Sequence, residues 1–147
     1  MPAEIIHLHQ NVIREINKLV ITQFGGERGL VNESSVEFIA ERVKTLHEKL
    51  EFREKIVGKA AFYLFQIVRE RHPFTDGNKR TGIIATEFFL FMNGHSLKYA
   101  QKEREKFLLE LASKKKSSKQ TAEWVRNGIT EELAMPANLD AYRQKKV

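Results

Sequence analysis

The stretch "KRTGIIATEFFLFMNG" at residues 79–94 is polar where it begins and apolar over most of its length. The ten residues from Ile83 to Met92 are apolar except for one Thr-Glu pair, and a helix that is apolar on all sides is buried. The Asn-Gly pair that follows is typical of a helix C-terminus. We therefore expect a buried central helix at about residues 79–93.

Amphipathic helices are predicted on the N-terminal side of this segment. Apolar residues recur at spacings of three and four along residues 4–24 and 54–71, which is the period of a helix with one buried face. Another helix is expected to begin at Ser34, because Ser34 and Glu37 stand in the relation of a capping box, and to end near Leu50.

Two shorter helices are predicted at residues 103–115 and 117–128, and the weaker pattern at 45–54 predicts a loop or a short β-hairpin flap. The sequence has no strand-like alternation of useful length and no internal repeat. It therefore predicts an all-α fold, a single-domain helical bundle around the buried central helix. The domain is expected to span residues 1–128, and the tail at 129–147 has no clear apolar stripe and receives no role.

Composition indicates a folded protein of the reducing cytoplasm. With 147 residues, 41% of them hydrophobic and 30% charged, the chain has the size and composition of one globular domain. It contains no cysteine, which excludes disulfides, thiolate metal sites and cysteine nucleophiles. The N-terminus does not resemble a signal peptide, and no apolar run nears the roughly 20 residues that span a bilayer. We expect a cytoplasmic protein with no membrane partner.

The charge balance favours anionic ligands. Lys and Arg number 25 against 19 Asp and Glu, and the resulting net charge of +6 attracts polyanions such as nucleic acid, acidic proteins and nucleotides. Positive charge is densest in "SKKKSSK" at residues 113–119. Because no aromatic residue interleaves these lysines, a solvated loop is favoured over a nucleic-acid patch.

The candidate site is the polar loop in "RHPFTDGNKRTG" (residues 71–82), which leads into the buried helix. Unpaired N–H groups and the dipole at a helix N-terminus bind anions, so a phosphate fits there. Gly77 allows close approach to the backbone, and Asn78 is expected either to cap the helix or to bond a phosphate oxygen. Lys79 and Arg80 place positive charge where the dipole disfavours it, and a bound anion explains them.

Three further side chains complete the candidate site. Asp76 would oppose phosphate binding, but a carboxylate beside phosphates commonly holds Mg²⁺. An imidazole can accept a proton from a hydroxyl near pH 7, so His72 is the candidate general base for attack on phosphorus. Phe74 is expected to point into the core and anchor the loop. The non-catalytic alternative is an ordinary turn in which Asp76 or Asn78 caps the helix. The spacing alone leaves both the catalytic and the non-catalytic interpretation open.

The segment "HPFTDGNKRTG" closely resembles the signature of the Fic/Doc (Fido) family, His-x-Phe-x-Asp/Glu-Gly-Asn-x-Arg, and a looser resemblance covers residues 1–128. It implies the Fido fold and ATP-dependent modification of a hydroxyl on a target protein, with ATP and Mg²⁺ as cofactors. The implied roles are a base at His72, a Mg²⁺ ligand at Asp76, an aromatic anchor at Phe74, and phosphate-binding positions at Gly77, Asn78 and Arg80.

Two departures from the family pattern favour one branch. Members that transfer AMP usually have glycine at the position of Lys79 and a second arginine at the position of Ile83. Lysine without the second arginine resembles the Doc (death-on-curing) branch, toxins that transfer the γ-phosphate of ATP to translation elongation factor Tu. Such a kinase, with Lys79 as an added phosphate contact, is the expected function. AMP transfer (AMPylation) is the first alternative and a non-catalytic basic binding module the second.

The resemblance also has an implication for regulation. Family members are restrained by an inhibitory helix with the pattern Ser/Thr-x-x-x-Glu-Gly/Asn, carried on the same chain or on a partner. No glutamate of this chain is followed by Gly or Asn. Besides its target protein, we therefore expect a separate antitoxin that supplies the inhibitory segment, and we do not expect nucleic acid as a partner.

Overall fold

The computed structural model describes residues 4–132. In this range the predicted all-α fold is confirmed, and its small antiparallel sheet pairs β1 with β2. The sheet does not lie at residues 45–54, where the chain makes a turn. Most of the tail predicted at 129–147, from residue 133 onward, lies outside the described residues. The elements are α1 (Gln10–Phe24), α2 (Glu33–Thr45), α3 (Phe52–Phe65), the π-helical turn η1 (Gln66–Glu70), α4 (Asn78–Met92), β1 (Ser96–Leu97), α5 (Gln101–Ala112), α6 (Ser118–Gly128) and β2 (Ile129–Thr130).

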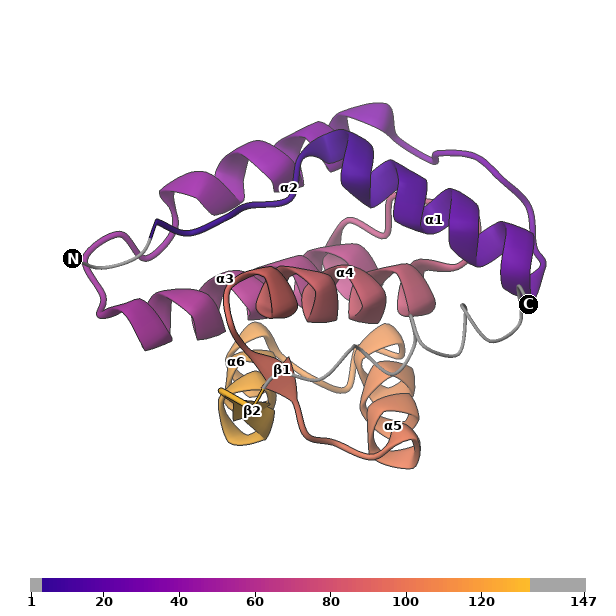
Figure 1. The fold of residues 1–147 in the computed structure, drawn as a ribbon. Helices are drawn as coiled ribbons and strands as arrows, with labels where there is room; N and C mark the ends of the chain where they lie inside the picture. The colour runs from indigo at the N-terminus through magenta and orange to yellow at the C-terminus, as the bar shows by residue number, and fades with distance from the viewer. Residues whose placement is uncertain (1–3, 133–147) are drawn as a thin grey trace.

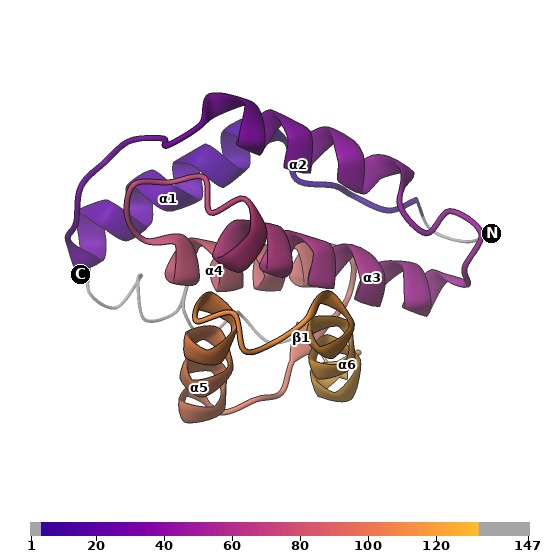
Figure 2. The ribbon, with the colours of Figure 1, turned by 180° about the vertical axis from the view of Figure 1, so that it is seen from behind.

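The helices form three layers with α3 and α4 in the middle (Figure 1). α1 and α2 cover one side of this pair and α5 and α6 cover the other, as the view from behind also shows (Figure 2). α4 is the predicted central helix, because Ile83, Ala85, Phe89 and Leu90 are each at most 1% exposed. Burial of each large apolar side chain of this kind stabilises a fold by about 1.5–3 kcal/mol.

A close crossing joins α4 to the end of α3. A β-carbon at Gly82 would overlap the side chain of Val68 in η1, so the backbone of α4 packs directly against this turn. Single π-helical turns are rare and occur frequently at functional sites. Here the turn ends at Glu70, immediately before the loop of residues 71–77, and sets where that loop leaves the helix.

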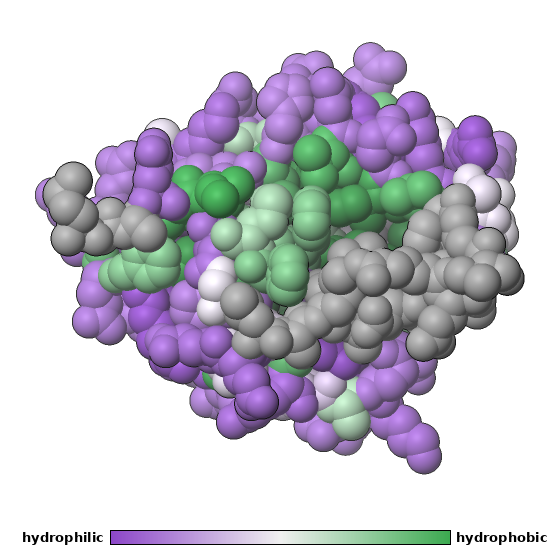
Figure 3. All heavy atoms as spheres, in the orientation of Figure 1, coloured by the Kyte–Doolittle hydropathy of each residue, from purple (hydrophilic) through white to green (hydrophobic). Residues whose placement is uncertain are grey.

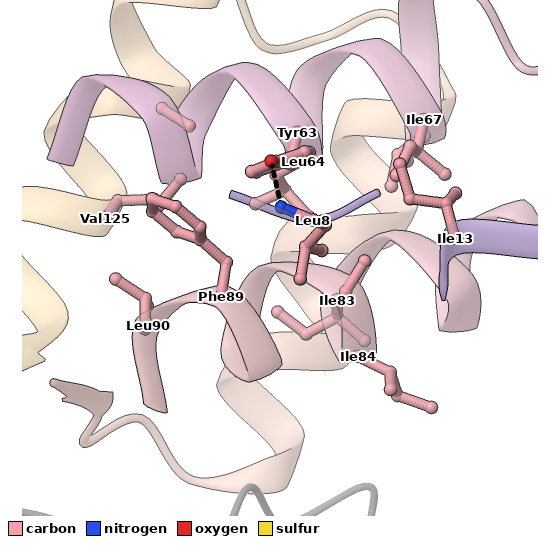
Figure 4. Close-up of a cluster of buried hydrophobic side chains, with 14 of the residues drawn as sticks. Leu8, Ile13, Tyr63, Leu64, Ile67, Ile83, Ile84, Phe89, Leu90 and Val125 are labelled. Atoms are coloured by element: carbon pink, nitrogen blue, oxygen red, sulfur yellow. Dashed lines mark hydrogen bonds between the residues drawn. The ribbon is translucent and has the colours of Figure 1, made fainter. Parts of the chain in front are cut away.

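The segment before α1 is extended, so the helix predicted from residue 4 begins later than expected. Long-range hydrogen bonds explain the difference. The N–H of Leu8 donates to the hydroxyl of Tyr63 at 2.9 Å inside the core (Figure 4). The side chain of Asn93 bonds both the N–H and the carbonyl of Ile6. These partners satisfy the backbone groups of Ile6 and the N–H of Leu8 without a helix.

Side chains cap the starts of α1 and α2, which differ from the predicted starts. His9 caps α1 through its ring nitrogen Nδ1. The capping box predicted at Ser34 is wrong, because Asn32 caps α2 and accepts the N–H of Ser34 at 3.0 Å. α2 ends at Thr45 rather than near Leu50, and the chain turns there toward α3.

A buried lysine closes the C-terminal end of α2. Lys59, which is 2% exposed, donates from Nζ to the carbonyl of Val43 at 2.7 Å and lies 2.9 Å from Nε2 of His7. Burial is the main cause that lowers the pKa of both Lys59 and His7, and the positive charge of Lys59 lowers the pKa of His7 further. The pair ties the N-terminal segment to the helices beneath it.

Hydrophobic side chains gather on the face that α1 and α4 present in Figure 1, as the space-filling view shows (Figure 3). A groove of about 340 Å³ lies there, with an apolar lining from Val12, Ile16 and Leu19 of α1 and from Ile84 and Phe88 of α4. Within residues 4–132, no helix combines the length and the apolar character needed to cross a bilayer.

Candidate active site

The motif loop, residues 71–77, connects η1 to α4 and brings His72 to the surface. The N–H groups of Arg71 and His72 both donate to the carbonyl of Gln66, at 2.8 and 3.1 Å. His72 has a φ of 46°, and a non-glycine residue in this left-handed region carries strain of about 1–3 kcal/mol. Such strain persists where the surrounding contacts impose it. The chain thereby leaves the helical path at His72 and exposes this side chain.

The side chain of Asn78 holds the motif loop together. Its Oδ1 accepts the N–H of Phe74 at 3.0 Å, and its Nδ2 donates to the carbonyl of Phe74 at 2.8 Å. The same Nδ2 lies 3.3 and 3.2 Å from the ring nitrogens Nδ1 and Nε2 of His72. Asn78 is 4% exposed and Phe74 is 2% exposed. Phe74 therefore lies in the core, as the sequence predicts. The amide is therefore used within the loop, and only the backbone of Asn78 is left for a ligand.

The N-terminus of α4 is open to an anion. Gly77 occupies the N-cap position with a φ of 80°, and no side chain caps the helix. The alternative in which Asp76 or Asn78 caps α4 is therefore wrong. The N–H of Thr81 donates to the carbonyl of Gly77 at 2.8 Å and is the first to bond within the helix. The preceding N–H groups of the first turn point outward without a partner in the helix.

Asp76 is held by α1 and by the segment that follows it. Its Oδ2 accepts the N–H of Glu27 at 2.7 Å, and its carbonyl accepts Nδ2 of the buried Asn17 at 2.9 Å. Two further backbone hydrogen bonds join residues 29–31 to residues 73–75. The carboxylate therefore has a fixed position at the edge of the loop.

The donor set around Asp76 fits a magnesium ion that is bound largely by its substrate. Oδ2 accepts the N–H of Glu27, which leaves Oδ1 for a cation. Among the described residues, no group of three or more His, Asp or Glu side chains could hold a metal ion by itself. Mg²⁺ characteristically uses one or two carboxylates together with phosphate oxygens and water. Asp76 would be its protein ligand when a nucleotide is bound.

The polar residues of the motif line one cleft of about 730 Å³, within the usual size range of small-molecule sites. Its lining includes Phe24 at the end of α1 and residues at the start of α4, and these two helix ends lie at the same end of the molecule (Figures 1 and 2). The guanidinium of Arg80 lies 4.2 Å from the ring centroid of Phe24 at this end. The predicted site residues that line the cleft are His72, Asp76, Gly77, Asn78, Lys79 and Arg80.

The cleft has a second wall that the sequence analysis missed. Helix α5 contributes Gln101, Arg104, Glu105, Leu108 and Leu109 to the lining. Their spacing places them on one face of the helix, but periodicity does not distinguish a face that lines a cleft from one that faces solvent. No motif in this part of the sequence could have identified them.

A buried ion pair fixes α5 against α4. Nε of Arg104 lies 3.0 Å from Oε1 of Glu87, and the two side chains are 7% and 2% exposed. The same guanidinium donates through Nη2 to the carbonyl of Leu97 at 2.8 Å. Removing one partner of a buried pair typically costs about 3–5 kcal/mol. The charged residue within the apolar helix therefore positions the second wall of the cleft.

An imidazole, a carboxylate and an open helix N-terminus in one cleft are the groups that a nucleotide-dependent transferase needs. The sequence model of the Fic/DOC family matches residues 2–90, more than half of the chain, and the protein belongs to this family. Its members are typically ATP-dependent transferases that modify proteins. A comparison with curated proteins finds no match. The matched region contains the whole motif loop and ends before α5.

Proposed function

We propose that this protein is a Doc-like kinase that transfers the γ-phosphate of ATP to a hydroxyl of a target protein. The observation that carries the proposal is the position of Lys79, which lines the cleft beside the open N-terminus of α4. At the other diagnostic position, Ile83 gives the same cleft an apolar side chain. This combination supports phosphate transfer, because AMP-transferring members usually have glycine and arginine at these two positions.

A triphosphate is favoured at the α4 end of the cleft. The first N–H groups of α4 point there, and the exposed side chains of Lys79 and Arg80 add positive charge. The absence of a side chain at Gly77 lets a phosphate approach the backbone. Bound through Asp76 and the phosphates, Mg²⁺ would neutralise the charge that develops during transfer.

His72 is the general base in this proposal. As the hydroxyl oxygen of the target attacks the γ-phosphorus, the imidazole takes the hydroxyl proton. The bond between the γ-phosphorus and its bridging oxygen breaks, and ADP leaves with the electron pair. Nδ2 of Asn78 lies 3.3 and 3.2 Å from the two ring nitrogens of His72, and the backbone N–H of Asn78, at the start of α4, would face the phosphates. One residue thus orients the base and contributes to the anion site.

The same proposal assigns two protein partners. Translation elongation factor Tu is the target that the Doc-like resemblance suggests. A separate antitoxin would supply the inhibitory segment, because no glutamate of this chain is followed by Gly or Asn. In a cell, production of the protein alone is then expected to arrest growth, and the His72→Ala variant is expected to be harmless. Equal growth with both proteins would contradict the toxin assignment.

The chemistry is tested by incubating the purified protein with Mg²⁺, a cell extract and ATP labelled on either the γ- or the α-phosphate. A Doc-like kinase labels a protein only from the γ-phosphate, and His72→Ala abolishes the label. Label from the α-phosphate would replace this function by AMP transfer. Absence of any His72-dependent label would favour a binding module. Lys79→Gly is expected to impair γ-phosphate transfer, and unchanged transfer would contradict the role of Lys79 as a phosphate contact.

A further inference from the structure

We propose that a surface of arginine and phenylalanine side chains beside the motif loop binds an acidic segment of the target protein. This arginine and aromatic surface consists of Phe38 of α2, Phe62 and Phe65 of α3, Arg69 of η1, and Arg71, which follows η1. None of these residues belongs to the family signature. The inference rests on the proposed function, because it names the chemistry of the partner that the same site would modify.

Each arginine of the surface lies over a phenylalanine ring. The Cζ atom of Arg71 is 4.0 Å from the ring centroid of Phe38, and that of Arg69 is 5.0 Å from the ring centroid of Phe65. The rings of Phe38 and Phe62 also meet, with centroids 6.4 Å apart. The surface is therefore continuous from α2 to α3, the two helices that face the viewer in Figure 2.

The guanidinium of Arg71 is available to a carboxylate of a partner. Arg71 is exposed, and no carboxylate within residues 4–132 forms an ion pair with it. Arg69, in contrast, pairs with the adjacent Glu70 at 3.1 Å. A guanidinium that stacks through its face keeps the N–H groups at its rim, where they form paired hydrogen bonds with a carboxylate. An acidic side chain is therefore the matching ligand.

The composition of the surface favours a protein partner over a nucleic acid. Arginine and aromatic residues are enriched at the centres of protein interfaces, and Phe38 is 36% exposed, so a partner can cover its ring. The ring orients the guanidinium of Arg71 beforehand, which reduces the entropy lost on binding. Nucleic acid is held through many cations along its phosphate chain, whereas this surface offers a single unpaired one.

The position of the surface links it to the candidate base. His72 lines the cleft, whereas Arg71, the preceding residue, extends its side chain to α2. An extended partner segment covers about 3.3–3.6 Å per residue. A carboxylate bound to Arg71 would therefore leave a hydroxyl a few residues away within reach of His72. The inference is that the target carries acidic residues close in sequence to the hydroxyl that receives the phosphate.

The first test is an NMR titration of the isotope-labelled protein with an oligoglutamate peptide, which is expected to shift the amide resonances of Phe38 and Arg71. Arg71→Gln removes the charge and keeps a polar side chain, and it should bind the peptide about tenfold more weakly. The matched control is Arg53→Gln, an exposed arginine at the opposite end of α3. Its peptide affinity should stay within about a factor of two of that of the unaltered protein.

The second test measures labelling of the target in a cell extract with γ-labelled ATP. Arg71→Gln should lower the labelling rate about tenfold and change the affinity for Mg-ATP by less than about a factor of two, because its side chain is not part of the cleft lining. Phe38→Leu should weaken both peptide binding and labelling, since the guanidinium loses the ring that orients it.

Several results would overturn the assignment. Equal effects of Arg71→Gln and Arg53→Gln would mean that net charge alone explains them. Shifts confined to residues 114–119 would place the acidic partner on the lysine-rich turn, and a dimer that Arg71→Gln dissociates would assign the surface to a second copy of the chain. Unchanged peptide binding in Phe38→Leu would contradict the stacked arrangement. If the peptide binds as expected and the extract shows no His72-dependent label, the proposed function fails while the acidic-segment surface stands.

Discussion

Replacing Asn78 with alanine should loosen the motif loop. Its side chain pairs with both the N–H and the carbonyl of Phe74, at 3.0 and 2.8 Å, in a place where Asn78 is only 4% exposed. A buried donor or acceptor left without a partner costs about 1–3 kcal/mol. Two such groups predict a loss of about 2–6 kcal/mol in the free energy of unfolding. This loss is a large fraction of the roughly 5–15 kcal/mol that stabilises a typical domain.

Urea denaturation followed by circular dichroism measures the loss. Asn78→Asp is the informative companion, because a carboxylate still accepts the N–H of Phe74 but cannot donate to its carbonyl. It should therefore also destabilise the protein despite its similar shape. Lys79→Ala is the control on the exposed neighbour, expected within about 0.5 kcal/mol of the unaltered protein. If Asn78→Ala matches that control, the side chain of Asn78 does not support the loop and our explanation of its burial is wrong.

Three further predictions concern stability. Gly77→Ala should lower the free energy of unfolding by about 1–3 kcal/mol in the same assay, since φ is 80° at this position; an unchanged value would contradict the tight turn. Tyr63→Phe leaves the buried N–H of Leu8 without an acceptor and should cost about 1–3 kcal/mol, whereas equal stability would mean that this bond contributes nothing. The folded state lowers the pKa of His7 below 6.5, so the unfolded chain takes up the proton first and stability should fall as the pH drops below that value. The His7→Gln variant removes the titrating partner of Lys59, so its urea midpoint should depend less on pH across this range. An unchanged pH dependence would contradict the assignment to His7.

Local patterns were sufficient to predict the helices and the loop that carries the chemistry. The apolar stretch around Phe89 could only be a buried helix, and the polar residues at its start indicated the anion site. The other five helices of residues 4–132 follow from periodicity, because each of them buries one face against its neighbours. The burial of Phe74 could be predicted for another reason, because it is the one large apolar side chain in a polar loop.

The remaining features depend on contacts between residues far apart in the sequence. The extended start of the chain is explained by Tyr63 and Asn93, which lie on other helices. The position of Asp76 is set by the N–H of Glu27 and by Asn17, which are 49 and 59 residues away in the sequence. The α5 wall is positioned by a pair formed with Glu87 across two helices. No local signal encodes these arrangements.

The most direct test of a nucleotide site at the start of α4 is an NMR titration of the isotope-labelled protein with Mg-ATP. The largest changes in backbone amide resonances are expected at Asn78, Lys79 and Arg80, whose N–H groups form the open first turn. The Asp76→Asn variant should need more Mg-ATP to reach the same change, because it lacks the carboxylate that would hold Mg²⁺. If these three amides stay unshifted at saturating Mg-ATP while others move, nucleotide binding at the motif loop is contradicted.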